Sequence, residues 1–189
     1  MNEMLKKYLK VSLTLGLIAG CSSLLIGMTN FVTKDRIIEN AKKREEDGLK
    51  KVFASITKEE EVKFEEKTIE KEYTYIQNIW TTTLASGSEV GTIYKTSGKN
   101  AYGSVTLLIG FEKGKSTLYQ MITLENTETF GAKLQDNYID EVNTGDREFS
   151  SVTCGATYGA KLCRAMVEEC IEDLGITTGG SEEDTGASA

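Results

Sequence analysis

The segment with the clearest chemistry is Cys154-Gly155-Ala156-Thr157, which stands directly before an amphipathic stretch. A small, flexible turn there presents the Thr157 hydroxyl at the start of a helix, where the first backbone N–H groups have no partner within the helix. These N–H groups and the helix dipole favour a bound phosphate. The sequence therefore predicts a phosphate beside Thr157, with Gly155 and Ala156 small enough for the backbone to approach it closely.

Composition excludes several other kinds of chemistry. The chain has no histidine, which removes His-dependent hydrolase triads, haem ligation by His and most catalytic zinc sites. Its four cysteines form no Cys-x-x-Cys pair, so we expect no iron–sulfur cluster, and Cys163 and Cys170 are expected to be small buried residues. The net charge of −7 is spread along the chain without a basic stripe, which argues against a nucleic-acid partner.

A membrane anchor is expected near the start of the chain. Residues 11–33 carry no charge, and about 20 apolar residues span the ~30 Å of hydrocarbon in a bilayer. The alternative is a lipoprotein signal cleaved before Cys21, because Ile18-Ala19-Gly20-Cys21 resembles a processing site. The apolar run continues past Cys21, which favours an uncleaved single-pass anchor. We expect residues 1–10 in the cytoplasm and the following domain on the extracytoplasmic face of the cell membrane.

The remaining elements must position Thr157, and their patterns predict an α+β fold. Residues 34–71 are expected to form a stalk helix followed by a charged linker. Within a domain over residues 72–176, strands are predicted at 73–83, 90–95, 102–111 and 118–124, followed by a loop from Glu125. Alternation in the hairpin puts one set of side chains on a single face: Val105, Leu107, Ile109 and Phe111. The result is an antiparallel sheet with a C-terminal helix.

That final helix has an apolar stripe and a charged face. The stripe comprises Gly159, Cys163, Met166, Cys170 and Leu174. Gly175 is expected to end the helix in a left-handed conformation. The acidic, Gly- and Ser-rich residues 177–189 have too little apolar surface to pack and are expected to be disordered.

Three motifs together carry a resemblance to a known family. Residues 152–157 resemble the Ser/Thr-Gly-Ala-Thr flavinylation motif of the FMN-binding domain family. Residues 101–104 resemble its Gly-Tyr-Gly-Gly strand opening, and residues 128–133 resemble its Glu-Thr-Pro-Gly-Leu-Gly-x-Lys loop. Cys154 stands where the family has Ser or Thr, Ser151 stands where it prefers Asp, and the loop lacks the Pro-Gly pair. The family includes the G subunit of Rnf ion-translocating electron-transport complexes.

The resemblance implies a covalent flavin. In the family a flavin transferase attaches FMN to the last threonine of the motif through a phosphoester, which corresponds to Thr157 here. The other residues implied in cofactor binding are Cys154, Gly155, Ala156, Lys133, Glu128, Thr129 and Tyr102. No metal ligand and no catalytic residue are predicted.

The resemblance also implies a function within a membrane complex. The chain would relay electrons beside other membrane subunits of an Rnf-type complex, which exchanges electrons between ferredoxin and NAD while moving Na+ or H+. No paired acid and base is evident, so the subunit itself is expected to pass electrons rather than convert a substrate. The alternatives are the C subunit of the Na+-translocating NADH:quinone reductase and an anchored FMN-binding module without an electron-transfer role.

Overall fold

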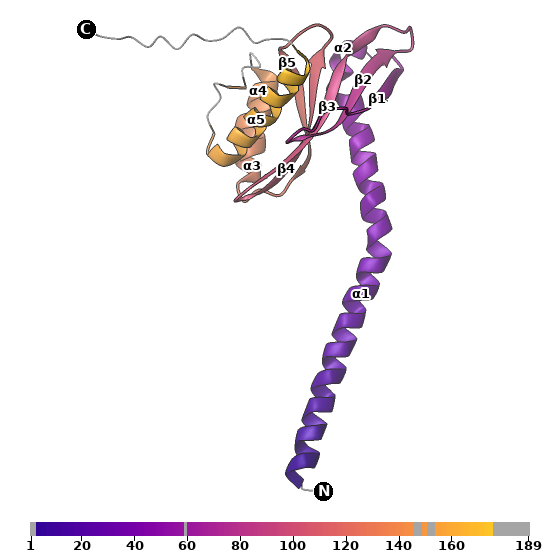
Figure 1. Ribbon diagram of the computed structural model, residues 1–189, viewed down its shortest axis with the longest axis vertical. Helices are drawn as coiled ribbons and strands as arrows, with labels where there is room; N and C mark the ends of the chain where they lie inside the picture. Colours follow the sequence, from indigo (N-terminus) through magenta and orange to yellow (C-terminus); the bar gives the residue numbers. More distant parts are fainter. Residues whose placement is uncertain (1–2, 59, 146–148, 151–153, 176–189) are drawn as a thin grey trace, which may run out of the picture. The chain divides into compact units, whose positions relative to one another are not determined.

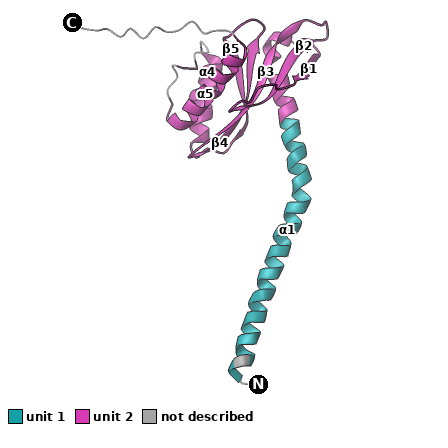
Figure 2. Ribbon diagram, viewed as in Figure 1, with its two compact units in different colours: residues 1–44 teal, residues 45–189 magenta. Residues whose placement is uncertain are grey.

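The computed structural model describes residues 3–58, 60–145, 149–150 and 154–175, and the expected disordered tail lies outside these ranges. The chain divides into two compact units, residues 1–44 and 45–189 (Figure 2). Its elements form the predicted α+β arrangement of a long N-terminal helix, an antiparallel sheet and a C-terminal helix (Figure 1).

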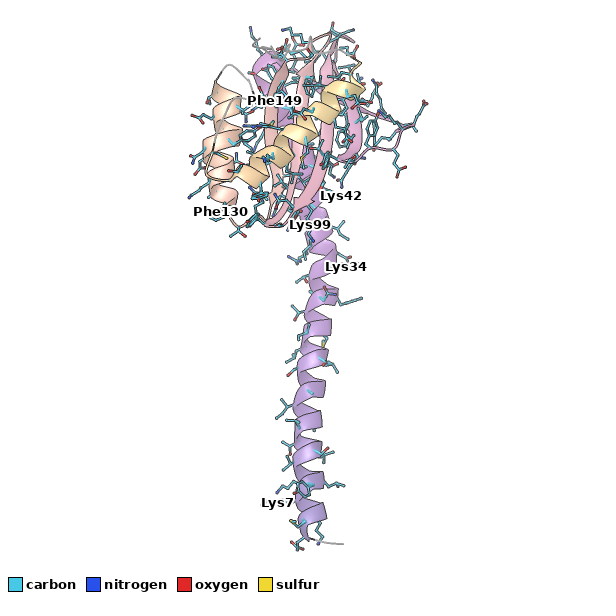
Figure 3. All side chains as sticks on the ribbon, turned by 60° about the vertical axis from the view of Figure 1, so that its left-hand side comes forward. Lys7, Lys34, Lys42, Lys99, Phe130 and Phe149 are labelled. Carbon is cyan, nitrogen blue, oxygen red and sulfur yellow. The ribbon has the colours of Figure 1, made fainter. Side chains whose placement is uncertain are left out.

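The first unit is formed by the greater part of helix α1 (Glu3–Val52). Its most apolar window has a mean hydropathy of 1.9, so by length and composition this helix can cross a membrane. Lys7 and Lys34 lie on either side of the uncharged segment (Figure 3). Threonine hydroxyls within the segment are satisfied locally. Thr14 and Thr29, for example, each donate a 2.8 Å hydrogen bond to the carbonyl four residues earlier.

The second unit is built on a five-stranded antiparallel sheet in sequential order. Its strands are β1 (Val62–Lys67), β2 (Ile76–Leu84), β3 (Glu89–Asn100), β4 (Gly103–Glu112) and β5 (Leu118–Asn126). Strand β1 corrects the sequence interpretation, which treated this segment as a linker. Charged residues dominate β1 because it is an edge strand, and Phe64 alone packs against the apolar cluster on one face.

Helices cover one face of the sheet. The main core lies between this face and α5 (Thr157–Asp173), together with the short helices α3 (Gly131–Leu134), η1 (Gln135–Ile139, a π-helix) and α4 (Asp140–Thr144). The sequence interpretation had a loop from Glu125 and missed these short helices. The three helices follow one another without a break, and their buried residues Leu134, Tyr138, Ile139 and Val142 recur at helical spacing. A helical pattern was therefore present in this segment but was not recognised.

The side chains expected to share one face of the hairpin do so. Val105, Leu107, Ile109 and Phe111 are all fully buried in the main core. Cys163 and Cys170 are also fully buried there, which confirms their expected role. Gly175 has a φ of +66° just beyond α5, as predicted for a helix-ending glycine.

The opposite face of the sheet is covered by the end of α1 and by α2 (Ala54–Thr57). Leu49, Val52 and Phe53 pack there in a second apolar cluster that includes Trp80. A Cβ atom on Gly48 would lie 2.7 Å from Leu108 Cδ1, so glycine allows the helix to approach the sheet closely. The final turns of the stalk helix are therefore part of the second unit.

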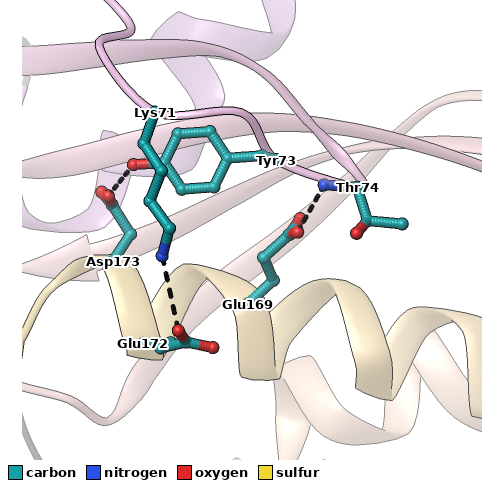
Figure 4. Close-up of polar contacts among 6 residues, drawn as sticks. All are labelled: Lys71, Tyr73, Thr74, Glu169, Glu172 and Asp173. Carbon is teal, nitrogen blue, oxygen red and sulfur yellow. Dashed lines mark hydrogen bonds and ion pairs between the residues drawn. The ribbon is translucent and has the colours of Figure 1, made fainter.

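Carboxylates near the end of α5 fasten it to the segment before β2. Glu169 accepts backbone N–H bonds from Thr74 at 2.6 Å, Tyr75 at 2.8 Å and Ile76 at 3.1 Å. Tyr73 donates its hydroxyl to Asp173, and this bond is the main cause that raises the pKa of Tyr73 to about 12 (Figure 4). The C-terminal half of α5 is thus held by hydrogen bonds as well as by apolar packing.

Candidate functional site

The turn between β3 and β4 places Tyr102 at the tip of a hairpin. Asn100 pairs with Gly103, so Ala101 and Tyr102 alone form the turn. The sequence interpretation began the strand at Tyr102, whereas β4 begins at Gly103. Tyr102, at the tip, is 42% exposed.

The Glu-Thr loop lies against this hairpin. The backbone N–H of Thr129 donates to the Tyr102 carbonyl at 3.0 Å, and the Thr129 hydroxyl donates to the same oxygen at 3.2 Å. Gly103 has a φ of +152°, and a Cβ atom there would lie 2.5 Å from the Thr127 carbonyl oxygen. Glycine is therefore required at this position, and two motifs distant in sequence become neighbours.

Helix α5 begins at Thr157, so the predicted position of its hydroxyl is confirmed. Thr157 is exposed, and the preceding Ala156 supplies no side-chain cap. The N–H of Ala156 instead donates to Cys154 Sγ at 3.4 Å. The Ala156 methyl group is buried in the main core, so this residue anchors the start of the helix. Ala156 therefore leaves the first N–H groups of α5 without a side-chain cap from the N-cap position, where an external acceptor such as phosphate can bind.

Glu128 is a nearly buried carboxylate beneath this helix start. It is 9% exposed and accepts a hydrogen bond from the Asn100 side chain. A Cβ atom on Gly159 would collide with Glu128 Oε2 and lie 2.8 Å from Leu134 Cδ2. The absence of a side chain at Gly159 therefore makes room for the carboxylate.

Lys133 approaches the motif from α3. If Gly155 carried a Cβ atom, that atom would lie 3.2 Å from Lys133 Cδ and 3.6 Å from Lys133 Nζ. The same Nζ lies 5.6 Å from the centre of the Phe130 ring. Glycine at 155 thus leaves space for a lysine whose charge suits a phosphate.

These elements enclose a cavity of about 200 Å³. Its lining comprises Tyr102, Glu128, Phe130 and the residues from Gly155 to Gly159. Tyr102 is the middle member of an aromatic group. The centre of its ring lies 5.1 Å from the ring centre of Tyr158 and 6.4 Å from that of Phe130. An apolar wall, a carboxylate and the Thr157 hydroxyl therefore meet in one place.

A larger cavity of about 480 Å³ lies beside Cys154 and Gly155. It is lined mainly by polar and acidic side chains, among them Asp136, Asp140 and Glu141. Their negative charge disfavours an anionic phosphate, and none of the described lining residues is aromatic. Within the described ranges, no group of acidic or cysteine side chains is arranged to hold a metal ion. The smaller, aromatic cavity is the better candidate for a cofactor.

Comparison with protein families connects this chain to a known complex. Residues 1–52 match a family model described as the RnfG N-terminal region. This match confirms the resemblance to the G subunit of Rnf complexes and supports a place for the chain in such a complex. No curated protein matches the chain.

The RnfG match lies outside the cavity, so the cavity has to be judged from its own residues. In this RnfG-like chain the predicted residues Tyr102, Glu128, Gly155, Ala156 and Thr157 line it together. Thr129, Lys133 and Cys154 are not among the lining residues, but each contacts one of them. Thr129 bonds to Tyr102, Lys133 lies against Gly155, and Cys154 accepts the N–H of Ala156.

Sequence reasoning missed several residues of this site. Asn100, Phe130 and Tyr158 were not predicted, and Gly159 was assigned only to the apolar stripe. Phe130 and Tyr158 stand inside or next to two of the motifs, so their aromatic character was the available signal. Their convergence on Tyr102 depends on the sheet register and could not be derived from local pattern.

Proposed function

We propose that this chain is the flavin-carrying electron-relay subunit of an Rnf-type complex, with FMN attached through a phosphoester to Thr157. The observation that carries the proposal is an exposed threonine at the start of α5, where Ala156 supplies no side-chain cap, beside an aromatic cavity. Lys133 beside Gly155 supplies a positive charge for the remaining phosphate oxygens. When bound, FMN supplies a centre that accepts electrons and passes them on.

The residues of the chain hold and orient the group. The N-terminus of α5 offers backbone donors to phosphate, and Gly155 keeps the approach open. The anchor of α1 keeps the domain at the membrane and so near membrane partners, with the domain on the extracytoplasmic face. The RnfG match favours this complex over the Na+-translocating NADH:quinone reductase.

The Cys154 substitution supports one other candidate, an anchored module that is not flavinylated. Cys154 takes the place of the usual Ser or Thr, and its sulfur accepts the N–H of Ala156. Sulfur is a weaker acceptor than a hydroxyl oxygen. A maturation enzyme that reads this turn would therefore meet a different surface.

Coexpression of the full chain with a flavin transferase separates these candidates. The purified protein should gain the mass of FMN less water and fluoresce in a denaturing gel, because a phosphoester survives unfolding. Thr157→Ala should abolish the signal at a stability cost of ~1 kcal/mol or less. Thr157→Ser should retain some attachment, because the nucleophilic oxygen remains.

Two control variants complete the experiment. Thr144→Ala removes an exposed hydroxyl that, among the described residues, bonds to carbonyls within α4, so it should leave the adduct unchanged. Cys154→Ser should be neutral or increase modification. An unmodified wild-type chain with active transferase, or an adduct retained in Thr157→Ala, would show that the assignment of Thr157 is wrong.

A further inference from the structure

Three exposed aromatic side chains surround the candidate attachment site. Tyr102 is 42% exposed, Phe130 46% and Tyr158 58%, although each lies in a structured part of the second unit. They come from the β3–β4 turn, the Glu-Thr loop and the first turn of α5. Exposed apolar surface gathered at one place commonly marks a binding site.

The geometry of the group suits a flat aromatic ligand. The ring planes of Tyr102 and Tyr158 are inclined by 45°, and those of Tyr102 and Phe130 by 52°. These tilted rings therefore surround a hollow rather than filling it by stacking on one another. The hollow is the cavity that Thr157 also lines.

We infer that Tyr102, Phe130 and Tyr158 form the resting surface of the isoalloxazine ring, an inference that rests on the proposed attachment at Thr157. The isoalloxazine ring is the expected occupant of the cavity, because its phosphate and ribityl tether to Thr157 confines it to this neighbourhood. Among the described residues, none that lines the acidic cavity beside Gly155 is aromatic.

The size of the cavity determines how the ring is held. Its volume of about 200 Å³ is below the ~300–1,000 Å³ of pockets that enclose a whole ligand. The surface therefore covers one side of the ring and leaves the other open. An open side lets the flavin exchange electrons with a partner without leaving its resting place.

Tyrosine contact can be measured directly, because a phenol next to an excited flavin quenches it by giving an electron that then returns. The test uses the full chain, flavinylated by coexpression and purified in detergent. Flavin fluorescence is measured in the folded protein and again after unfolding, and the ratio of the two is compared among variants. The wild type should be strongly quenched when folded.

Replacement of tyrosine by phenylalanine keeps the ring but removes the easily oxidised phenol. The double variant Tyr102→Phe/Tyr158→Phe should therefore raise the folded-state fluorescence several-fold, and each single variant should give part of this rise. Tyr119→Phe is the matched control, because this tyrosine packs on the opposite face of the sheet and should leave the ratio unchanged. Phe130→Ala should increase quenching by iodide, because it uncovers an edge of the ring.

The outcomes separate this inference from the proposed function. If the flavin is attached but its fluorescence ratio and iodide quenching are the same in all variants, the inference that these residues hold the ring is wrong, while the attachment at Thr157 remains supported. The three side chains would then be available to a partner subunit. A chain without attached flavin would overturn the proposed function and this inference with it.

Discussion

The carboxylate of Glu169 offers a sharp test of what holds α5 in place. One of its oxygens accepts the N–H groups of Tyr75 and Ile76, and the other accepts that of Thr74. Glu169→Gln keeps one oxygen but turns an NH2 group toward a backbone donor. The variant therefore loses one hydrogen bond and the charge assistance of two others.

The expected magnitude follows from these contacts. A hydrogen bond to a charged group contributes about 1.5–3 kcal/mol and a neutral bond about 0.5–1.5 kcal/mol. Because Glu169 is partly exposed, water offsets some of the loss, and we expect destabilisation of about 2–3 kcal/mol. For a chain of this size that corresponds to a fall in Tm of about 4–10 °C.

The assay is thermal unfolding of the full chain without flavin in detergent, followed by circular dichroism and by fluorescence of Trp80. This residue is the only tryptophan and is buried on the opposite face of the sheet, so its signal reports on the whole domain. Glu168→Gln is the matched control, since its side chain is exposed on the same helix and should change stability by about 0.5 kcal/mol or less. Equal melting of the Glu169→Gln and Glu168→Gln variants would refute the reasoning.

Titration, thiol labelling and mass measurements test three other features. The pKa of Tyr73 is raised from 10.0 to about 12, chiefly by its hydrogen bond to Asp173. The contribution of this bond to stability is therefore complete below pH 10 and is lost as the pH rises toward 12. In Tyr73→Phe the alkaline fall in Tm should be shallower than in the wild type, and an unchanged profile would contradict this. Burial raises the pKa of Cys163 to about 12, so alkylation of the folded protein, mapped by peptide mass, should modify the half-buried Cys154 and spare Cys163 until unfolding. Intact mass should show the residues before Cys21 retained and no lipid, whereas an acylated Cys21 at the N-terminus would disprove the uncleaved anchor.

The sequence by itself determined the features that depend on local pattern. An uncharged run long enough to span a membrane is evident from composition, and the RnfG N-terminal match lies over the same region. Alternation in β4 predicted which side chains share the main-core face, because successive residues of a strand point to opposite faces. It did not predict that Leu108, on the other face, is also buried. The start of α5 at Thr157 followed from the Gly-Ala turn and the apolar stripe behind it.

Only the tertiary structure decided which distant residues meet. The close β3–β4 turn at Asn100 and Gly103 carries Tyr102 to the Glu-Thr loop, and this pairing depends on strand register. Packing of α5 on the sheet then brings Gly159 against Glu128 and Tyr158 against Tyr102. Each of these contacts joins elements that are distant in the sequence, and no local sequence pattern predicts that they meet. Their positions follow from burying one face of the sheet under one helix, which is a property of the whole domain.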